Sequence, residues 1–160
     1  MVPEPEWARL ARAGWRYHGQ ERPPFAIVPG PGQESVWDYP RPPAIEPDVR
    51  EIVVRLGALE IARSRRGVRL LETASPPTFY IPPADVRTTF LQLEAVVSRC
   101  EWKGEARYEA LRGCFAFYPS RVECTVDGVV VVPQPGRFYG GWITPELVGP
   151  FKGEPGSEGW

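Results

Sequence analysis

The sequence predicts a mainly β domain of short strands and hairpins, with one or two short helices and an extended N-terminal arm. Twenty prolines are spread along the 160 residues, and proline lacks the amide hydrogen that a helix interior or a central strand requires. Apolar and polar residues alternate through the middle of the chain, and turn residues separate the alternating segments. The length is enough for one domain with a substantial core.

A short helix is predicted at the N-terminus. In residues 4–14, Trp7, Leu10 and Ala11 follow the spacing of one helix face. Gly14 can end this helix, because glycine readily adopts the left-handed conformation found after the last helical turn.

An extended arm is predicted to follow the helix. Residues 21–47 contain too much proline and glycine for regular structure. The arm carries four apolar anchors, which are Phe25, Val36, Trp37 and Tyr39, and such anchors favour an ordered arm over a disordered one. We therefore divide the chain into residues 1–47, a helix and proline-rich arm packed on the domain, and residues 48–160, a β domain with a glycine-rich, aromatic C-terminal wrap.

The first strands are predicted between residues 50 and 83. The segment REIVVRLGALEIARS alternates on both sides of Gly57 as a hairpin, and GVRLLET follows after an RRG turn. The segment PTFYIPP reads as a short strand bounded by prolines, which suits the edge of a sheet.

The second half of the chain gives a mixed pattern. DVRTTFLQL and ARYEALR are weaker strand candidates, and the second can also form a helix. CFAFYP is predicted to form a strand, and RVECTVDGVVVVP a hairpin across Asp127 and Gly128, a favoured type I′ pair. Residues 136–160 are predicted to form a final strand and an ordered wrap.

Charge and composition argue against several classes of partner. The net charge of -1 gives no basic surface for nucleic acid or anionic membranes. No apolar run approaches the roughly 18 residues of a membrane span, and the N-terminus lacks the apolar core of a secretory signal. Three irregularly spaced cysteines argue against a disulfide framework and for a reducing compartment, so we expect a cytoplasmic protein.

Neither a metal nor a cofactor is predicted. Structural zinc needs four cysteine or histidine ligands, normally in close pairs, whereas Cys100, Cys114 and Cys124 stand far apart and His18 is the single histidine. The sequence has no phosphate-binding loop of the Walker or dinucleotide type. Cys114 and Cys124 read as small apolar residues of buried strands.

The segment CEWKG, which begins at Cys100, is predicted to be a turn into a strand. Neighbouring residues of an extended segment point to opposite faces, so Trp102 would pack inward and Lys103 would face a pocket. Cys100 would share the buried side of Trp102. Arg99 and Lys103 can lower the pKa of its thiol, but a packed cysteine remains the favoured interpretation.

A ligand pocket can be assembled from residues around this segment. Its aromatic wall would be Tyr80, Trp102 and Tyr108, and its polar groups would be Arg66, Glu72 and Lys103. Ligand pockets commonly combine an apolar, aromatic wall with a few convergent polar groups. The alternative is that the aromatic residues build the core and the charged residues surround its rim.

Three functions follow as hypotheses. The first is a small-molecule binding protein, for a nucleotide or another metabolite, that uses this pocket. The second is a transferase-like enzyme that acts on a nucleotide or another small polar substrate, with Lys103 as electrostatic stabiliser and Glu72 or Asp85 as acid or base. The third is an interaction module or homodimer, because the chain ends are rich in tryptophan, a residue favoured at interfaces.

Several long motifs carry a family resemblance. GQESVWDYPRPP, LLETASPPTFYIPPADV, CEWKG with a following tyrosine, and YGGWIT with VGPFKGEPG resemble the DUF427 family of bacterial proteins, also catalogued as NTP_transf_9. The resemblance spans residues 15–160 and implies a β-tent-like architecture without zinc. The matching positions are Glu72, Pro77, Tyr80, Pro82, Pro83, Asp85, Val86, Cys100, Trp102, Lys103, Gly104 and Tyr108.

The chain departs from the family pattern after Tyr108. Family members usually carry an extra stretch before the strand that corresponds to AFYP, and here ARYEALRGCFAFYP joins the two almost directly. If that stretch lines the family's pocket, the pocket of this protein is more open. The catalogue label suggests nucleotidyl transfer, but the paired acids of such a site are absent from the sequence.

Overall fold

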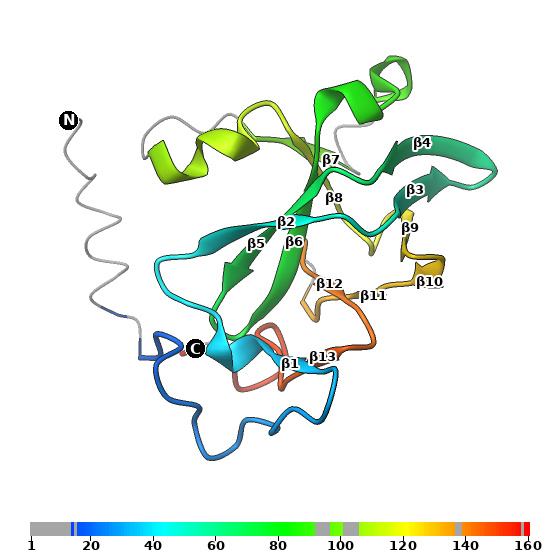
Figure 1. Cartoon of the computed structure of the whole chain (residues 1–160). Coiled ribbons are helices and arrows are strands. Elements are labelled where there is room, and N and C mark those ends of the chain that lie inside the picture. Colours follow the sequence, from blue (N-terminus) through cyan, green and yellow to red (C-terminus); the bar gives the residue numbers. More distant parts are fainter. Residues whose placement is uncertain (1–13, 15, 92–96, 101–105, 137–138, 158) are drawn as a thin grey trace.

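The computed structural model describes residues 14, 16–91, 97–100, 106–136, 139–157 and 159–160. Within them the strands form a five-stranded sheet, a four-stranded sheet and two short strand pairs (Figure 1). The strands are β1 Glu34–Ser35, β2 Ala44–Asp48, β3 Ile52–Leu56, β4 Leu59–Ser64, β5 Gly67–Glu72, β6 Ser75–Ile81, β7 Val97–Arg99, β8 Phe115–Phe117, β9 Glu123–Val126, β10 Val129–Val130, β11 Val132–Pro133, β12 Trp142–Ile143 and β13 Leu147–Val148.

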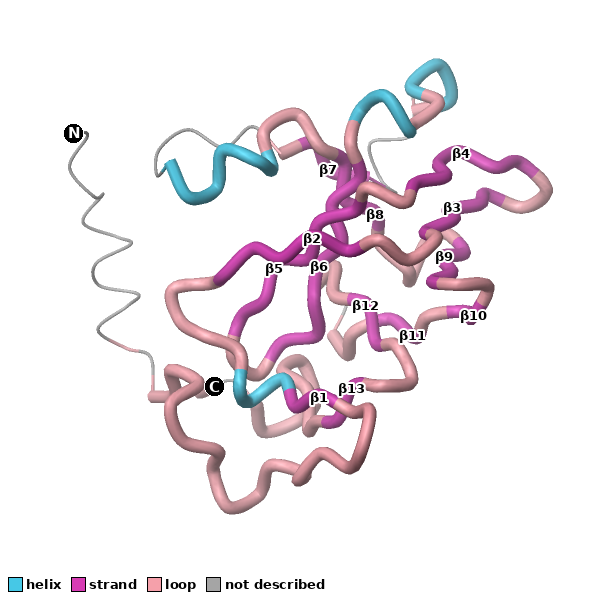
Figure 2. The backbone as a smooth tube through the Cα atoms, viewed as in Figure 1, coloured by secondary structure: helices cyan, strands magenta, loops and turns pink. Residues whose placement is uncertain are grey.

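Helical structure in the described residues is limited to short 3-10 helices (Figure 2). They are η1 Val36–Asp38, η2 Pro83–Asp85, η3 Thr88–Phe90 and η4 Ala106–Leu111. The mainly β prediction is thereby confirmed. None of the helices in the described part of the chain has the length and apolar character that crossing a membrane requires.

The two larger sheets are built from antiparallel neighbours. The five-stranded sheet has the order β2-β5-β6-β8-β7, and the four-stranded sheet has the order β10-β9-β3-β4. Both predicted hairpins are confirmed: β3 and β4 join at Gly57 with φ +58, and β9 and β10 join at Asp127 and Gly128, whose φ angles are +47 and +79. Two positive φ angles are what a type I′ turn requires.

The main core lies between these two sheets. Strands of the five-stranded sheet contribute Phe79, Ile81, Phe115 and Phe117, all buried, and β3, β4 and β9 supply the facing aliphatic side chains. Trp142 closes this core: its ring stacks on Phe79 at 4.8 Å between centroids, and its indole N–H donates to the Phe117 carbonyl at 3.0 Å. The predicted burial of Cys114 and Cys124 is confirmed.

A second core cluster holds the N-terminal arm against the last residues. Trp37 is fully buried there, and its indole N–H donates to the Pro150 carbonyl at 3.0 Å. The rings of Tyr17, Phe25 and Trp160 lie within 5.0–5.2 Å of the Trp37 ring centroid. The parallel pairing of β1 with β13 continues this contact, so both ends of the described chain meet beneath the sheets (Figure 1).

The sequence interpretation was wrong for two segments. The PTFYIPP strand, β6, is the central strand of its sheet and not an edge. Its prolines are tolerated because Pro76 and Pro77 fall beside a register shift in the pairing with β5, and β8 pairs only with Tyr80 and Ile81.

DVRTTFLQL, residues 85–93, is the second misread segment, because its described residues 85–91 form the end of η2, an isolated bridge between Val86 and Ala62, and η3 instead of a strand. Pro83 occupies the first position of η2, where a missing amide hydrogen costs nothing. ARYEALR takes the helical alternative as η4. The helix predicted for residues 4–14 falls almost wholly outside the described residues.

Candidate functional site

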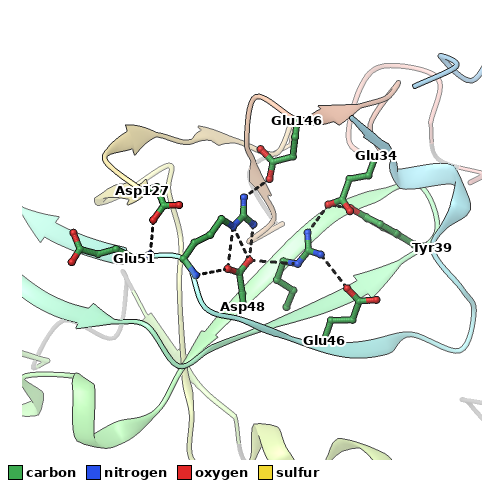
Figure 3. A network of polar contacts seen from close by, with 9 residues as sticks. Glu34, Tyr39, Glu46, Asp48, Glu51, Asp127 and Glu146 are labelled. Atoms are coloured by element: carbon green, nitrogen blue, oxygen red, sulfur yellow. Dashed lines mark hydrogen bonds and ion pairs between the residues drawn. The ribbon is translucent and has the colours of Figure 1, made fainter. Parts of the chain in front are cut away.

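A cleft of about 390 Å³ lies where the chain passes from β2 to β3. Segments distant in sequence meet there: the residues around β1, the β2–β3 connection, strand β5 and the residue before β13. The cleft is lined by Gly32, Gln33, Glu34, Pro47, Asp48, Val49, Arg50, Arg69 and Glu146. Its most distinctive content is a network of charged side chains, which Figure 3 shows from close by.

Arg69 lies at the centre of one half of this network. It stands directly opposite Glu46 in the β2–β5 register, so the two side chains share a face of the sheet. Its Nη2 donates to Glu46 at 3.1 Å and its Nη1 donates to Glu34. Its Nε lies 3.6 Å from Asp48 Oδ2, and this buried nitrogen has no hydrogen-bond partner among the described residues.

Arg50 and Asp48 form the other half. The side chain of Asp48 is only 5% exposed, and it accepts from the Arg50 backbone N–H at 3.0 Å and from Nη2 at 2.6 Å. Arg50 Nη1 also donates to Glu146, which ties the residue before β13 to the β2–β3 connection. The guanidinium lies over the Phe79 ring, with its central carbon 5.8 Å from the ring centroid, a favourable cation–π geometry.

The network holds its acids in the charged form. Burial acts to raise the pKa of Asp48, but the hydrogen bonds and charges of Arg50 and the charge of Arg69 outweigh it, so the pKa is lowered. Burial likewise acts to raise the pKa of Glu146, and hydrogen bonds from Thr144, its own backbone and Arg50 lower it overall.

The two guanidiniums are held in the charged form as well. The hydrogen bond to Asp48 is the largest influence on Arg50, and its pKa is raised. For Arg69, burial acts to lower the pKa, and the hydrogen bond and charge of Glu34 outweigh it. Burial and the neighbouring Glu34 raise the pKa of Tyr39, whose hydroxyl donates to that carboxylate at 2.8 Å.

Carboxylates outnumber guanidiniums in this network. Glu34, Glu46, Asp48 and Glu146 face two arginines, which leaves an excess of two negative charges. Each carboxylate can accept about four hydrogen bonds, so acceptor capacity also remains. Such an arrangement can bind a cation through its carboxylates, because both arginines already donate hydrogen bonds to carboxylates of the network.

Of the residues predicted from the sequence, Arg66 and Asp85 come together. Arg66 Nη2 donates to Asp85 Oδ1 at 2.6 Å, and the Ser64 hydroxyl donates to Oδ2 at 2.6 Å. The Arg66 side chain is 65% exposed. The hydrogen bond from Arg66 lowers the pKa of Asp85, against a smaller effect of burial. This pair lies at the start of β5.

Glu72 lies at the opposite end of β5 and so does not join that pair. Six residues of strand separate the two ends, a span of about 20 Å. Glu72 Oε1 accepts from Arg41 Nε at 3.1 Å, and the Arg41 side chain has no exposed surface. Arg41 Nη2 donates to the Thr73 carbonyl at 2.9 Å, so these contacts fasten the arm to β5.

The two predicted tyrosines occupy different surroundings. Tyr108 is buried in η4, and its hydroxyl donates to the Pro43 carbonyl at 3.0 Å. Tyr80 is half-buried on β6, and burial with the neighbouring Cys100, Tyr118 and Cys114 raises its pKa to about 12. Trp102 and Lys103 lie outside the described residues. Cys100 is partly exposed, so its predicted burial was wrong.

Sequence reasoning missed the cleft, although one signal was present. Glu46 and Asp48 alternate along β2 and therefore share a face, Arg50 follows in the bend after β2, and Arg69 stands between apolar residues of β5. A charged residue that points inward from such a strand needs a partner. None of the predicted residues that the structure describes lines the cleft.

The described residues contain no group of three or more metal-ligating side chains placed to hold a metal ion. Fold and cleft together define a mainly β protein with an acid-rich ionic cleft at the connection between β2 and β3. Residues 44–113 match the family model NTP_transf_9, described as a domain of unknown function (DUF427). The matched segment runs from β2 through η4, so this part of the chain is similar to that family. A search of curated proteins found no match.

Proposed function

We propose that this protein binds a small polar molecule that carries a positively charged group, such as an amine or a guanidine, in the ionic cleft. One observation carries the proposal: the charged network at a cleft of about 390 Å³ contains four carboxylates, three of which line the cleft, against two guanidiniums. A cationic ligand would supply the missing positive charge.

The existing contacts favour a cation over an anion. Both arginines already donate to carboxylates, so an anion would have to displace one of these partners. A phosphate group would also enter a field of excess negative charge, which disfavours a nucleotide as ligand. A cationic group can instead use the free lone pairs of Glu34 and Glu146, both of which line the cleft.

The electrostatics of the cleft favour binding over acid–base catalysis. A general acid or base works best with a pKa near the working pH. In this cleft the pKa values move away from neutral pH: those of Asp48 and Glu146 are lowered, and those of Arg50 and Arg69 are raised. Fixed charges of this kind orient a ligand instead of exchanging protons with it.

Thermal shift and calorimetric titration test the proposal. A panel of small primary amines, guanidines and zwitterionic amino acids is compared with dicarboxylates and sugar phosphates of similar size. We expect only compounds with a cationic group to raise the melting temperature, and we expect added salt to weaken their binding. Stabilisation by the anions, with none by the cations, would refute the proposal.

Matched variants locate the site. Glu146→Gln removes one carboxylate of the cleft, and we expect it to weaken binding of the cation about tenfold or more. Glu109→Gln is the control, because Glu109 forms an exposed pair with Arg112 on η4. An equal effect of both changes would place binding elsewhere, for example at the predicted aromatic wall that includes Tyr80.

Self-association is a second candidate function, and one observation favours it. Strand β10 forms an edge of the four-stranded sheet, and Val129, Val130 and the nearby Val132 are 48–60% exposed. Unpaired edges with apolar side chains readily pair with another chain. Light scattering over a concentration series tests this candidate: a monomer at every concentration refutes it, and loss of association in Val130→Lys supports it.

The cellular location we propose is the cytoplasm. The three cysteines are free thiols in the structure, and free thiols suit a reducing compartment. Fractionation of cells that express the tagged protein tests this, and recovery outside the cytoplasm would refute it.

A further inference from the structure

Cys100 and Cys114 lie opposite each other where the β7–β8 pair ends. The register of the two strands runs through Val97 with Phe117 to Arg99 with Phe115, and one further step opposes the two cysteines. The Cys100 N–H donates to the Cys114 carbonyl at 2.9 Å, and the Gly113 N–H donates to the Cys100 carbonyl at 2.8 Å. The backbone is therefore hydrogen-bonded on both sides of the pair.

This arrangement is a β-bulge that begins at a glycine. Gly113 has φ +75, the left-handed conformation that the first residue of this bulge adopts. Gly113 and Cys114 together oppose Cys100, so the bulge fixes which residue of the turn faces Cys100. Residues directly opposite in an antiparallel pair carry their side chains on the same face.

The same face carries Tyr80 and Tyr118. Tyr80 pairs with Ala116 on β8, and Cys114 and Tyr118 stand two residues to either side of Ala116. The electrostatic influence of Cys100, Cys114 and Tyr118 on Tyr80 agrees with this placement. Cys100 likewise acts on Cys114, after burial, to raise the pKa of that thiol. Two thiols therefore occupy one small part of the sheet surface.

We propose that Cys100 and Cys114 form a dithiol site that a hydroperoxide oxidises to a reversible intramolecular disulfide. Hydrogen-bonded opposite residues have Cα atoms about 5.5 Å apart, which falls inside the range of about 4.4–6.8 Å that a disulfide spans. Because opposite residues of an antiparallel pair carry their side chains on one surface, the two Cβ vectors do not point to opposite faces, which would prevent a disulfide.

The exposure of the two thiols sets the order of the chemistry. Cys100 is partly exposed and Cys114 is buried, so Cys100 meets the oxidant first. The Cys100 thiolate attacks one oxygen of the hydroperoxide: an S–O bond forms, the O–O bond breaks, and the leaving oxygen takes up a proton. Cys114 then loses its proton and attacks the Cys100 sulfur, so that an S–S bond forms and water leaves.

The net reaction is balanced and reversible. Two thiols lose two electrons and two protons, and one hydrogen peroxide becomes two waters. A small thiol reductant restores both cysteines by exchange through a mixed disulfide. In a reducing compartment, a bond of this kind forms transiently and reports oxidant exposure.

Cys124 supplies an internal control. It is 1% exposed and lies in the main core, where its thiol donates to the Val122 carbonyl at 3.8 Å. Burial, with a contribution from Glu123, raises the pKa of this thiol. We expect it to stay reduced under conditions that oxidise the pair.

Peptide mapping by mass spectrometry tests the proposal on the native full-length chain. After treatment with hydrogen peroxide and blocking of free thiols, we expect one crosslinked peptide pair that contains Cys100 and Cys114, with the loss of two hydrogens. Cys124 should carry the blocking group, and dithiothreitol should return all three free thiols. Over-oxidised Cys100 beside a free Cys114, or a disulfide between two chains, would overturn the proposal.

A bifunctional alkylating reagent gives a measurement that needs no oxidant. Dibromobimane becomes strongly fluorescent only after both of its arms have reacted with thiols, so it reports a close pair directly. We expect fluorescence with the wild type and with Cys124→Ser, and its loss with Cys100→Ser and with Cys114→Ser. Equal labelling of folded wild type and Cys114→Ser would refute the pairing.

Discussion

Replacing Asp48 with asparagine should destabilise the protein through the loss of one buried charge. Asp48 accepts hydrogen bonds from the backbone, Nε and Nη2 of Arg50 and lies 3.6 Å from Arg69 Nε. Removing one partner of a buried ion pair costs about 3–5 kcal/mol. Asparagine keeps its carbonyl oxygen as an acceptor, and Glu146 still binds Arg50, so we expect a loss of about 2–4 kcal/mol.

Urea denaturation of the wild type and of Asp48→Asn measures this free energy of unfolding. Glu46→Gln is the matched control, because Glu46 pairs with the same Arg69 but is 54% exposed, and an exposed pair contributes at most about 1 kcal/mol. A loss below about 1 kcal/mol for Asp48→Asn, or a loss no larger than that of the control, would refute the reasoning.

The difference in unfolding free energy between wild type and Asp48→Asn should also depend on pH. The pKa of folded Asp48 is lowered from its ordinary value of 3.8, so its contribution to stability is fully present above the unfolded value. It is lost as the pH falls through the folded pKa. The difference in unfolding free energy between wild type and Asp48→Asn should therefore be constant near neutral pH and shrink below about pH 4. A difference that grows on acidification would contradict the assigned sign.

Three further predictions concern the arm and its anchors. Trp37→Ala should lower the free energy of unfolding by about 3–5 kcal/mol, because a fully buried indole and its hydrogen bond are lost. In urea denaturation, a loss below about 1 kcal/mol would mean that the arm does not pack as described. Gly153→Ala should lower the melting temperature more than Gly156→Ala. A Cβ at position 153 would lie 1.9 Å from the Pro135 carbonyl oxygen, whereas a Cβ at position 156 would have no described atom within 4 Å. Equal effects of the two variants would refute the steric argument. Glu72→Gln should lower the free energy of unfolding by about 1–2 kcal/mol, because it weakens the hydrogen bond to buried Arg41 while Glu72 itself is one-third exposed. It should leave cation binding unchanged, and a loss of binding would place Glu72 in the ligand site.

Local chemistry made the hairpins predictable. Gly57 and the Asp127–Gly128 pair each fix a turn through residues that tolerate positive φ, and no distant contact is needed to decide the outcome. The position of β6 within its sheet was not predictable in this way. Its neighbours, β5 and β8, are separated by more than 30 residues, and proline at a strand start is compatible with either an edge or a central strand.

The cleft could be predicted only in part. The alternation of Glu46, Asp48 and Arg50 is visible in the sequence, and so is the isolated charge of Arg69. What the sequence does not contain is the partner of each charge, because the antiparallel register of β2 with β5 and the parallel pairing of β1 with β13 decide it. Charge pairing across distant segments follows from topology, and the topology was not determined by local patterns.

The excess negative charge of the cleft arises from segments that flank the matched DUF427 residues. Within residues 44–113, the network contains two carboxylates, Glu46 and Asp48, and two guanidiniums, so that part is neutral. Glu34 comes from β1 and Glu146 from the residue before β13, and the pairing of these two strands brings both acids to the same cleft. The proposed preference for a cation is therefore a property of the flanking strands acting together with the matched domain.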